Sequence, residues 1–209
     1  MYDLNKIQSA NAQKNRKLVL TAMFSAMSVI ITTLNITIPF PILPYLKIDF
    51  AEIPVTIAFY MLGPIHGLIT STIYWIILTA RAGNFLGPAM KYAAVLSMLI
   101  GYYVAKRVFN NYNSQKIVIM GLGFAIIVRV IVMSLVNYGV ILFIAPYYLG
   151  FIKGLLSVAG LPYTSTSEIM MWTMIITAAY NMLHCLVSLV LGYMITEKVV
   201  KRLQLPQQR

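Results

Sequence analysis

Charged residues are scarce in this chain of 209 residues: they make up 10% of it, whereas hydrophobic residues make up 60%. Soluble domains carry about 25% charged residues, so the composition excludes a soluble globular protein. Glycine (12) and proline (9) are few and follow no period, which excludes collagen-like and low-complexity chains. The single cysteine, Cys185, lies in an apolar segment and supports neither a disulfide framework nor a cysteine metal site. The class that remains is an integral membrane protein.

Catalytic motifs are also missing. The chain has two histidines, His66 and His184, and neither has an acid near it in the sequence or a serine nucleophile motif to serve. The zinc-protease, Walker A and dinucleotide-binding patterns are absent from the sequence. We therefore predict no enzyme, no catalytic residues and no metal site, and any active transport must draw its energy from another subunit or from an ion gradient.

Apolar runs bounded by basic or turn residues predict an all-α bundle of six transmembrane helices. The runs cover about residues 18–40, 53–62, 65–80, 84–105, 117–145 and 169–195. They form one membrane domain, 18–197, between a polar segment, 1–17, and a tail, 198–209. Because Gly63-Pro64 divides residues 53–80, the second helix covers only about half of a 30 Å hydrocarbon core. Short helices at membrane depth are tolerated where they line a cavity, so this break points to a substrate site.

Basic residues predict the orientation. With six spans both tails lie on one side, and only Lys47, Arg81 and Lys153 lie on the other. The excess of basic residues on the side of the tails predicts that both termini face the cytoplasm. The basic residues on that side are Lys6, Lys14, Arg16, Lys17, Lys106, Arg107, Lys116, Lys198, Lys201, Arg202 and Arg209.

Five polar residues fall within the predicted spans: Lys91, Arg129, Asn137, Asn181 and His184. Ionisable groups in hydrocarbon cost about 3 kcal/mol or more and usually face a cavity. Asn181 and His184 are three residues apart, so they share one helical face, where they either converge on a ligand or hydrogen-bond to another helix. Lys91 either reaches a ligand or extends to the membrane interface. For Arg129 we favour a neighbouring carbonyl or a partner protein over a substrate.

The loop 39–50 is stiffened by Pro39, Pro41 and Pro44 yet stays apolar, so it must pack on something. It is either a rigid connector on the bundle or a lid over a pocket at the outer face. Asp49 precedes the second helix and Glu52 opens it, and helix-terminal electrostatics explains both.

Small residues mark the first helix. Ala22 and Ala26, four residues apart, allow another helix to approach closely. The alternative is packing within the bundle.

Together these segments resemble the substrate-binding S components of energy-coupling factor (ECF) vitamin transporters, and within them the riboflavin-binding group. The resemblance rests, in order, on six segments: Ala22/Ala26, Leu46-Lys-Ile-Asp-Phe-Ala-Glu-Ile-Pro54, Leu62-Gly-Pro-Ile-His-Gly67, Gly87-Pro88, Asn137-Tyr138 with Pro146, and Ala179-Tyr-Asn-Met-Leu-His184.

The resemblance implies a six-helix bundle that binds a vitamin under the first loop. It further implies partnership with a transmembrane T subunit, which Ala22 and Ala26 would face, and two cytoplasmic ATPase subunits that drive release. Asn137, Asn181 and, by position only, His184 match the family's ligand-binding positions. Riboflavin-binding relatives usually carry a lysine in place of His184 and an acid near the position of Lys91, so this chain departs from the pattern twice.

We therefore predict a riboflavin-binding subunit in a prokaryotic plasma membrane. Asn137, Asn181, His184 and Lys91 would satisfy the polar edges of the ligand. The residues expected to enclose its ring are Tyr45, Leu46, Phe50, Tyr74, Trp75 and Tyr138.

Three alternatives remain at this stage. The ligand could be thiamine, pantothenate, folate or a related precursor, because the two departures leave the vitamin open. A stand-alone ion-coupled transporter is disfavoured because the five acids all lie at or outside the ends of the predicted spans. A structural or assembly factor without a ligand is the third.

Overall fold

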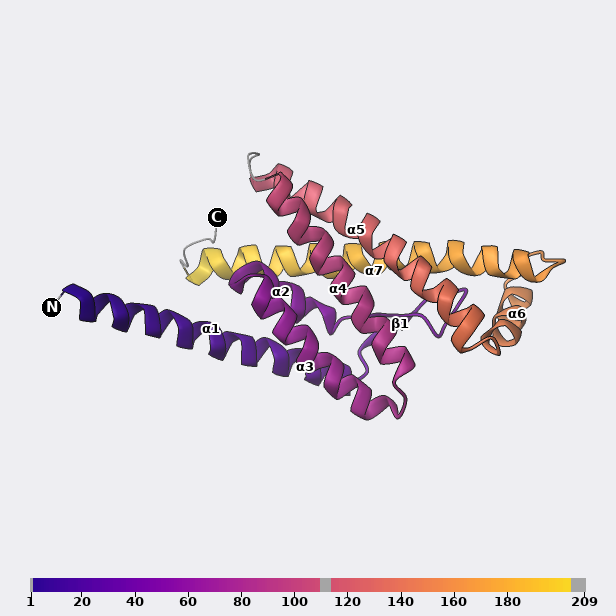
Figure 1. Cartoon of the computed structure of the whole chain (residues 1–209), viewed down its shortest axis with the longest axis horizontal. Helices are drawn as coiled ribbons and strands as arrows, with labels where there is room; N and C mark the ends of the chain where they lie inside the picture. The colour runs from indigo at the N-terminus through magenta and orange to yellow at the C-terminus, as the bar shows by residue number, and fades with distance from the viewer. Residues whose placement is uncertain (1, 110–113, 204–209) are drawn as a thin grey trace.

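The computed structural model describes residues 2–109 and 114–203, with side chains for residues 11–109 and 115–202. The last residues of the predicted tail, 204–209, lie outside this part, as do the side chain of Lys6 and residues 110–113. The chain folds into a helical bundle with one small hairpin (Figure 1). Its helices are α1 (Tyr2–Thr33), α2 (Glu52–Leu62), α3 (Pro64–Ala82), α4 (Leu86–Val108), α5 (Ser114–Gly139) with its π-helical continuation η1 (Val140–Ile144), α6 (Tyr148–Val158) and α7 (Thr166–Leu203).

The first loop contains a two-stranded antiparallel sheet, which the sequence did not predict. Strand β1 (Thr37–Pro39) pairs with β2 (Lys47–Asp49), with Ile38 opposite Ile48. The predicted first span, 18–40, is therefore too long, since α1 ends at Thr33. Asn35 has a φ of 52°, a left-handed conformation that no helix can continue through. The three prolines lie in this hairpin and its turn, outside any helix.

The break at Gly63-Pro64 is confirmed. Gly63 has a φ of 105°, its N–H donates to the Phe59 carbonyl, and Pro64 begins α3 where a missing N–H costs nothing. After the break, α2 and α3 pack closely at Gly67, because a Cβ there would lie 2.7 Å from the Cβ of Phe59. The short α2 thus has neighbours on several sides and is largely buried.

One helix, α6, was not predicted. Its Ile152 and Leu156 are buried in the same hydrophobic cluster as Ile169 and Met170 of α7, whereas Phe151 and Val158 are exposed. With 11 residues α6 is too short to cross a bilayer. It caps the end of the bundle (Figure 1).

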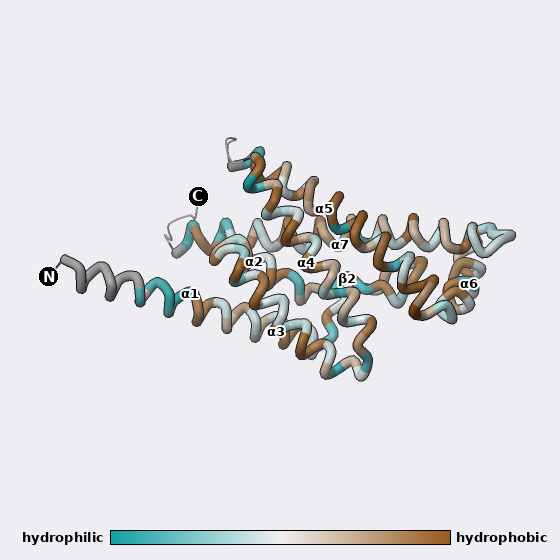
Figure 2. The backbone as a smooth tube through the Cα atoms, viewed as in Figure 1, coloured by the Kyte–Doolittle hydropathy of each residue, from teal (hydrophilic) through white to brown (hydrophobic). Residues whose placement is uncertain are grey.

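In the part of the chain that the structure describes, three helical segments are long and apolar enough to cross a membrane: Asn11–Thr33, Gln115–Ile144 and Thr166–Arg202. Apolar side chains also face outward, for example Ile127, Ile131 and Leu135, one turn apart along α5. Figure 2 shows that hydrophobic residues continue along the outer helices rather than being confined to the interior. An outward apolar surface of this kind requires lipid, so the membrane character of the chain is confirmed.

The bundle has two unlike ends. The C-terminal end of α7, the C-terminal end of α4 and the N-terminal half of α1 lie towards one end, and α6 lies at the other (Figure 1). Between them, the main hydrophobic core joins α2, α4, α5 and α7 through residues such as Val55, Val95, Ala125 and Leu189. This core supports the floor of a cavity that opens in the half nearer α6.

Candidate functional site

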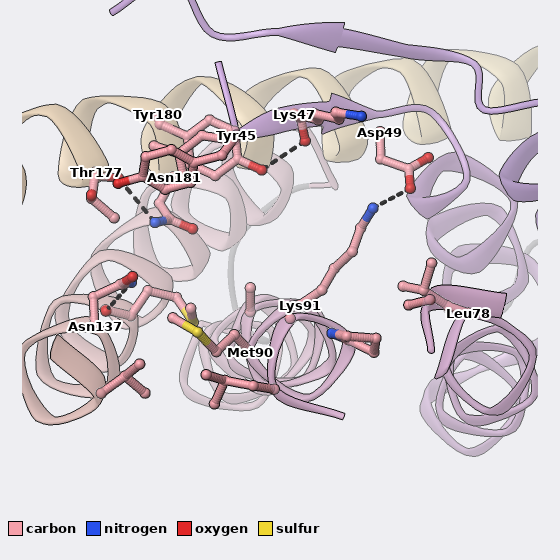
Figure 3. Close-up of a pocket in the computed structure, with 18 of the residues that line it drawn as sticks. Tyr45, Lys47, Asp49, Leu78, Met90, Lys91, Asn137, Thr177, Tyr180 and Asn181 are labelled. Atoms are coloured by element: carbon pink, nitrogen blue, oxygen red, sulfur yellow. Dashed lines mark hydrogen bonds and ion pairs between the residues drawn. The ribbon is translucent and has the colours of Figure 1, made fainter. Parts of the chain in front are cut away.

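A cavity of about 510 Å³ lies between the hairpin and the helices (Figure 3). Its wall is formed by the end of α1, both strands of the hairpin, the C-terminal end of α3, the start of α4, the second half of α5 with η1, α6 and the first half of α7. The volume falls within the range of about 300–1,000 Å³ that is usual for small-molecule sites. Elements distant in sequence therefore meet around one space of suitable size.

Two asparagines face this cavity from different helices, Asn137 from α5 and Asn181 from α7 (Figure 3). The Nδ2 atom of Asn137 donates to the Met133 carbonyl at 2.6 Å, and Nδ2 of Asn181 donates to the Thr177 carbonyl at 2.9 Å. Each amide nitrogen carries two hydrogens, so each keeps one for a ligand. The cavity thus holds two polar groups anchored to their own helices by i–4 contacts.

Behind Asn181 lies a buried charge cluster centred on Arg129 of α5. Its guanidinium forms a fork with Glu52, with Nη1 at 2.9 Å from Oε2 and Nη2 at 3.3 Å from Oε1. Nε donates to Oδ1 of Asn181 at 3.2 Å, and Nη2 lies 3.1 Å from Nδ1 of His184. Both Glu52 and Arg129 are almost inaccessible to solvent, so the pair is stable only because each charge satisfies the other.

These contacts correct two interpretations of the sequence. Arg129 pairs with a carboxylate and is buried, so it neither binds a backbone carbonyl nor faces a partner protein. Glu52, assigned to helix-terminal electrostatics, is also fully buried and accepts from Ser188 at 3.1 Å. It does begin α2, but α2 starts inside the bundle, directly after the hairpin, so its first residue is deep.

A second ion pair spans the cavity. Lys91 extends from α4 to Asp49 of β2, and its Nζ contacts Oδ2 of that carboxylate (Figure 3). The hydroxyl of Tyr74 donates to the same oxygen at 3.0 Å, and the N–H of Ala51 donates to Oδ1 at 2.7 Å. The Lys91 side chain keeps 21% of its surface accessible. Lys91 therefore does not extend to the membrane interface but ties the hairpin to α4.

Half of the predicted ligand-contacting residues line the cavity, namely Tyr45, Leu46, Lys91, Asn137 and Asn181. Tyr45 is the one whose ionisation bears on ligand binding. It keeps 39% of its surface exposed, but the burial of its ring, with the Tyr148 phenol as a smaller cause, raises the pKa of Tyr45 to about 12. Its phenol is neutral at physiological pH. Binding by these five residues stays a prediction.

The other five predicted residues are not part of the cavity wall. Tyr74 is buried against Asp49, and Trp75 stacks on Tyr92 with ring centroids 4.9 Å apart. Tyr138 is 48% exposed on the outer surface, because it follows Asn137 by one position and so points about 100° away around the helix.

Phe50, also outside the wall, is half-buried directly after β2. His184 is fully buried, and its Nε2 lies 3.2 Å from the Asp49 carbonyl and 3.3 Å from Oε1 of Glu52. It contacts the elements that form the wall without reaching the cavity.

Several wall residues were missed in the sequence. Tyr180 lines the cavity, and its hydroxyl donates to the Lys47 carbonyl at 2.7 Å, which holds β2 against α7. The sequence offered one signal for Tyr180, namely its position directly before Asn181. Among residues 2–109 and 114–203, no group of three histidine, cysteine or acidic side chains is arranged to hold a metal ion.

The two alanines predicted to meet a partner lie on the outside of α1. Ala22 and Ala26 are exposed, together with Met23 and Met27. The opposite face of the helix turns inward, where the Ser25 hydroxyl donates to a backbone carbonyl in its own helix. The small-residue pair therefore is not used to pack α1 within the described bundle.

Comparison with known proteins identifies the family that this chain resembles. Residues 16–196 match the family described as ECF transporter, substrate-specific component. The chain is 33% identical to the riboflavin transporter RibU of Staphylococcus aureus over 75% of its own length and 79% of that protein. It is 34% identical to the riboflavin transporter FmnP of Bacillus subtilis over 62% of its own length and 68% of that protein.

A solved structure agrees with these sequence matches. The S component of a bacterial ECF transporter superposes with a TM-score of 0.71 at 26% identity, covering 91% of this chain and 98% of the other. The expectation drawn from six short motifs is confirmed, and the chain belongs to the family of substrate-specific components of ECF transporters.

Proposed function

We propose that this chain is the high-affinity substrate-binding subunit of an ECF transporter for riboflavin. The observation that carries the proposal is the pair Asn137 and Asn181, which face one cavity of about 510 Å³ from two helices. The similarity to riboflavin transporters of two bacteria supports the choice of vitamin.

The hydrogen-bonding capacity of the two amides suits a flavin. One edge of the flavin ring is an imide, in which an N–H group lies between two carbonyl oxygens. Asn137 keeps one N–H and its carbonyl oxygen free of the contacts described above, and Asn181 keeps one N–H. Donor, acceptor and donor on the protein complement acceptor, donor and acceptor on the ring.

The remainder of the cavity suits the other parts of the vitamin. Leu46, Met90 and Ile141 supply apolar surface for a planar ring, and Tyr45 adds an aromatic one. Lys91 borders the same space and is available to the hydroxylated chain. Sites of this class are mostly apolar, with a few polar groups that fix the orientation of the ligand.

The membrane arrangement that we propose has six crossing helices, α1 to α5 and α7, in one domain with both termini in the cytoplasm. Support comes from the charge distribution: the N-terminal half of α1 and the C-terminal ends of α4 and α7, which are the helix ends rich in basic residues, lie in the half away from α6 (Figure 1). The cavity then opens towards the outer face of the plasma membrane, with the hairpin of loop 39–50 as its lid. A prokaryotic cell is the setting that the family implies.

The partners that we propose are a transmembrane T subunit and two ATPase subunits, because the described chain carries no nucleotide-binding motif of its own. The exposed pair Ala22 and Ala26 is the proposed contact for the T subunit. Replacing both by leucine should abolish co-purification with the T subunit while riboflavin affinity of the isolated chain stays unchanged. Loss of both properties together would contradict an interface role.

A spectrum tests the choice of vitamin. We expect the detergent-purified protein to show flavin absorption near one equivalent, and added riboflavin to lose fluorescence on binding to stripped protein. Release of another vitamin on heating, identified by mass spectrometry, would change the substrate but not the class. If no vitamin is released and none raises the melting temperature, an ion-coupled transporter or an assembly factor would replace this proposal.

A further inference from the structure

The guanidinium of Arg129 reaches the cavity wall but has no donor left for a ligand. A guanidinium carries five N–H groups and no acceptor. Besides the contacts to Glu52, Asn181 and His184, Nη1 lies 3.4 Å from the sulfur of Met98. These five contacts account for all five hydrogens. The residue therefore acts on the cavity through its neighbours rather than by binding.

The neighbour that matters is Asn181, whose amide is held at both ends. Because the guanidinium can only donate, the amide atom that faces it must be the carbonyl oxygen. Because the Thr177 carbonyl can only accept, the atom that faces it must be the nitrogen. The amide thus has one orientation, fixed from α5 by Arg129 and from α7 by Thr177. Asn181 is left with an N–H to offer to the cavity.

Arg129 is in turn held in place by groups that suit its charge. Nη2 of Arg129 lies 3.1 Å from Nδ1 of His184, and because a guanidinium can only donate, this contact is a hydrogen bond in the tautomer that leaves Nδ1 unprotonated. The hydroxyl hydrogen of Tyr180 is used by the Lys47 carbonyl and does not compete for this atom. Nε2 lies 3.3 Å from Oε1 of Glu52 and 3.2 Å from the Asp49 carbonyl, and the Asp49 N–H also points at it at 3.2 Å, so both donors and acceptors surround this nitrogen.

This arrangement explains one departure from the riboflavin-binding pattern. A lysine in place of His184 could only donate, and its charge would lie beside the guanidinium. The positive charge in this part of the site comes from α5, and position 184 supplies an acceptor instead. The two residues are matched to each other.

We propose that Arg129 is a positioning residue that orients Asn181 as a hydrogen-bond donor to a ring carbonyl of the ligand, and so sets selectivity for that carbonyl. The inference rests on the proposed function, since it takes riboflavin as the ligand. It differs from a role in stability alone, because it predicts a change in the ratio of two affinities.

The test compares riboflavin with its two thiocarbonyl analogues, in which one ring carbonyl oxygen is replaced by sulfur, a poor acceptor. We expect the wild-type protein to bind riboflavin about tenfold more tightly than the analogue altered at the carbonyl that Asn181 faces, the loss of one good hydrogen bond. In Arg129→Lys, which keeps the charge but lacks the planar fork, this ratio should fall towards one. The analogue altered at the carbonyl that Asn137 faces is the internal control, because its affinity relative to riboflavin should not depend on Arg129. Affinities are measured by fluorescence quenching on the full chain.

Two further variants protect the test against misfolding. The double variant Glu52→Gln/Arg129→Gln removes both buried charges together and leaves neither unpaired. Asn181→Asp keeps an oxygen for Arg129 but presents no N–H to the ligand, and it should also bring the ratio towards one. The matched control is Glu197→Gln/Lys201→Gln, which removes an exposed ion pair of α7 and should leave the ratio at the wild-type value.

Each outcome is decisive. A wild-type ratio near one for both analogues would overturn the inference without any variant, while riboflavin binding itself would still support the proposed function. Equal weakening of all three ligands by the Arg129 variants, with the ratio kept, would reduce Arg129 to a stabilising residue. An analogue altered only on the benzenoid ring, far from the carbonyls, should show no dependence on Arg129.

Discussion

The two ion pairs of the cavity region differ in what surrounds them. Arg129 and Glu52 are both inaccessible to solvent, with side-chain accessibilities of 1% and 0%. Lys91 keeps 21% of its surface accessible, and its partner Asp49 keeps 4%. Both carboxylate oxygens of Glu52 already accept hydrogen bonds from protein donors. Lys91, in contrast, lines the cavity, where a ligand could replace its protein partner.

This difference separates two uses of charge in a membrane protein. A pair that is buried on both sides organises its neighbours and is costly to break, because the remaining charge has no water. A pair at the edge of a cavity is inexpensive to open, because water or ligand replaces the partner. The location of a pair therefore predicts the cost of breaking it better than its contact distances do.

The largest effect is expected for the buried pair. Glu52→Gln leaves Arg129 charged and unpaired, and we expect the variant to lose about 3–5 kcal/mol of stability. The measurement is unfolding of the purified protein by heat or denaturant in a fixed detergent. A loss as small as that for an exposed carboxylate would show that water reaches the cluster, and would contradict the difference drawn between the two ion pairs.

The amide coupled to the buried pair should have the next largest effect. Asn181→Leu removes one donor and one acceptor, and we expect the free energy of riboflavin binding to weaken by about 1–3 kcal/mol, or roughly fivefold to 150-fold in affinity. Tyr138→Leu, on the exposed face of α5, is the control and should leave the affinity unchanged. An unchanged affinity in Asn181→Leu would place the ligand elsewhere.

The pair at the cavity edge should cost less to break. In Lys91→Met, the largely buried Asp49 keeps its contacts with the Tyr74 hydroxyl and the Ala51 N–H, so we expect a stability loss of about 1–3 kcal/mol, below that of Glu52→Gln. Faster riboflavin dissociation should accompany it, because the hairpin loses its tie to α4. A stability loss equal to that of Glu52→Gln would show that the two pairs do not differ.

The exposed pair on α7 sets the lower limit. Glu197 and Lys201 are one turn apart at 2.8 Å, and both are largely accessible. Removing the pair should cost the least of these changes at low salt and nothing at high salt. The same unfolding assay at two salt concentrations checks this, and a loss that persists in high salt would show an additional packing role for one of the side chains.

Local signals in the sequence predicted much of the bundle. The break at Gly63-Pro64 follows from glycine and proline geometry and needs no tertiary context. Asn137 and Asn181 were singled out because amides are expensive in hydrocarbon, and both line the cavity. Helix α6 was not predicted, because with 11 residues it is shorter than the apolar runs by which transmembrane helices are recognised.

Long-range partners could not be read in this way. Arg129 is visible in the sequence as a charge within an apolar run, but its partner Glu52 is 77 residues away, at the start of a helix. Only the folded chain shows that this helix begins inside the bundle. Tyr138 and Trp75 were placed in the wall by their aromatic character, and their direction around a helix decided otherwise.

The hairpin is anchored to α7 mainly through its backbone. The Tyr180 hydroxyl binds the carbonyl of Lys47, and Nε2 of His184 lies 3.2 Å from the carbonyl of Asp49. Every amino acid offers a carbonyl, so these anchors place no demand on which side chains the strand carries. Position 47 should therefore tolerate broad substitution in a saturation library without detaching the hairpin. An evolving lineage could remodel the side of the hairpin that lines the cavity while it keeps the same attachment to the bundle.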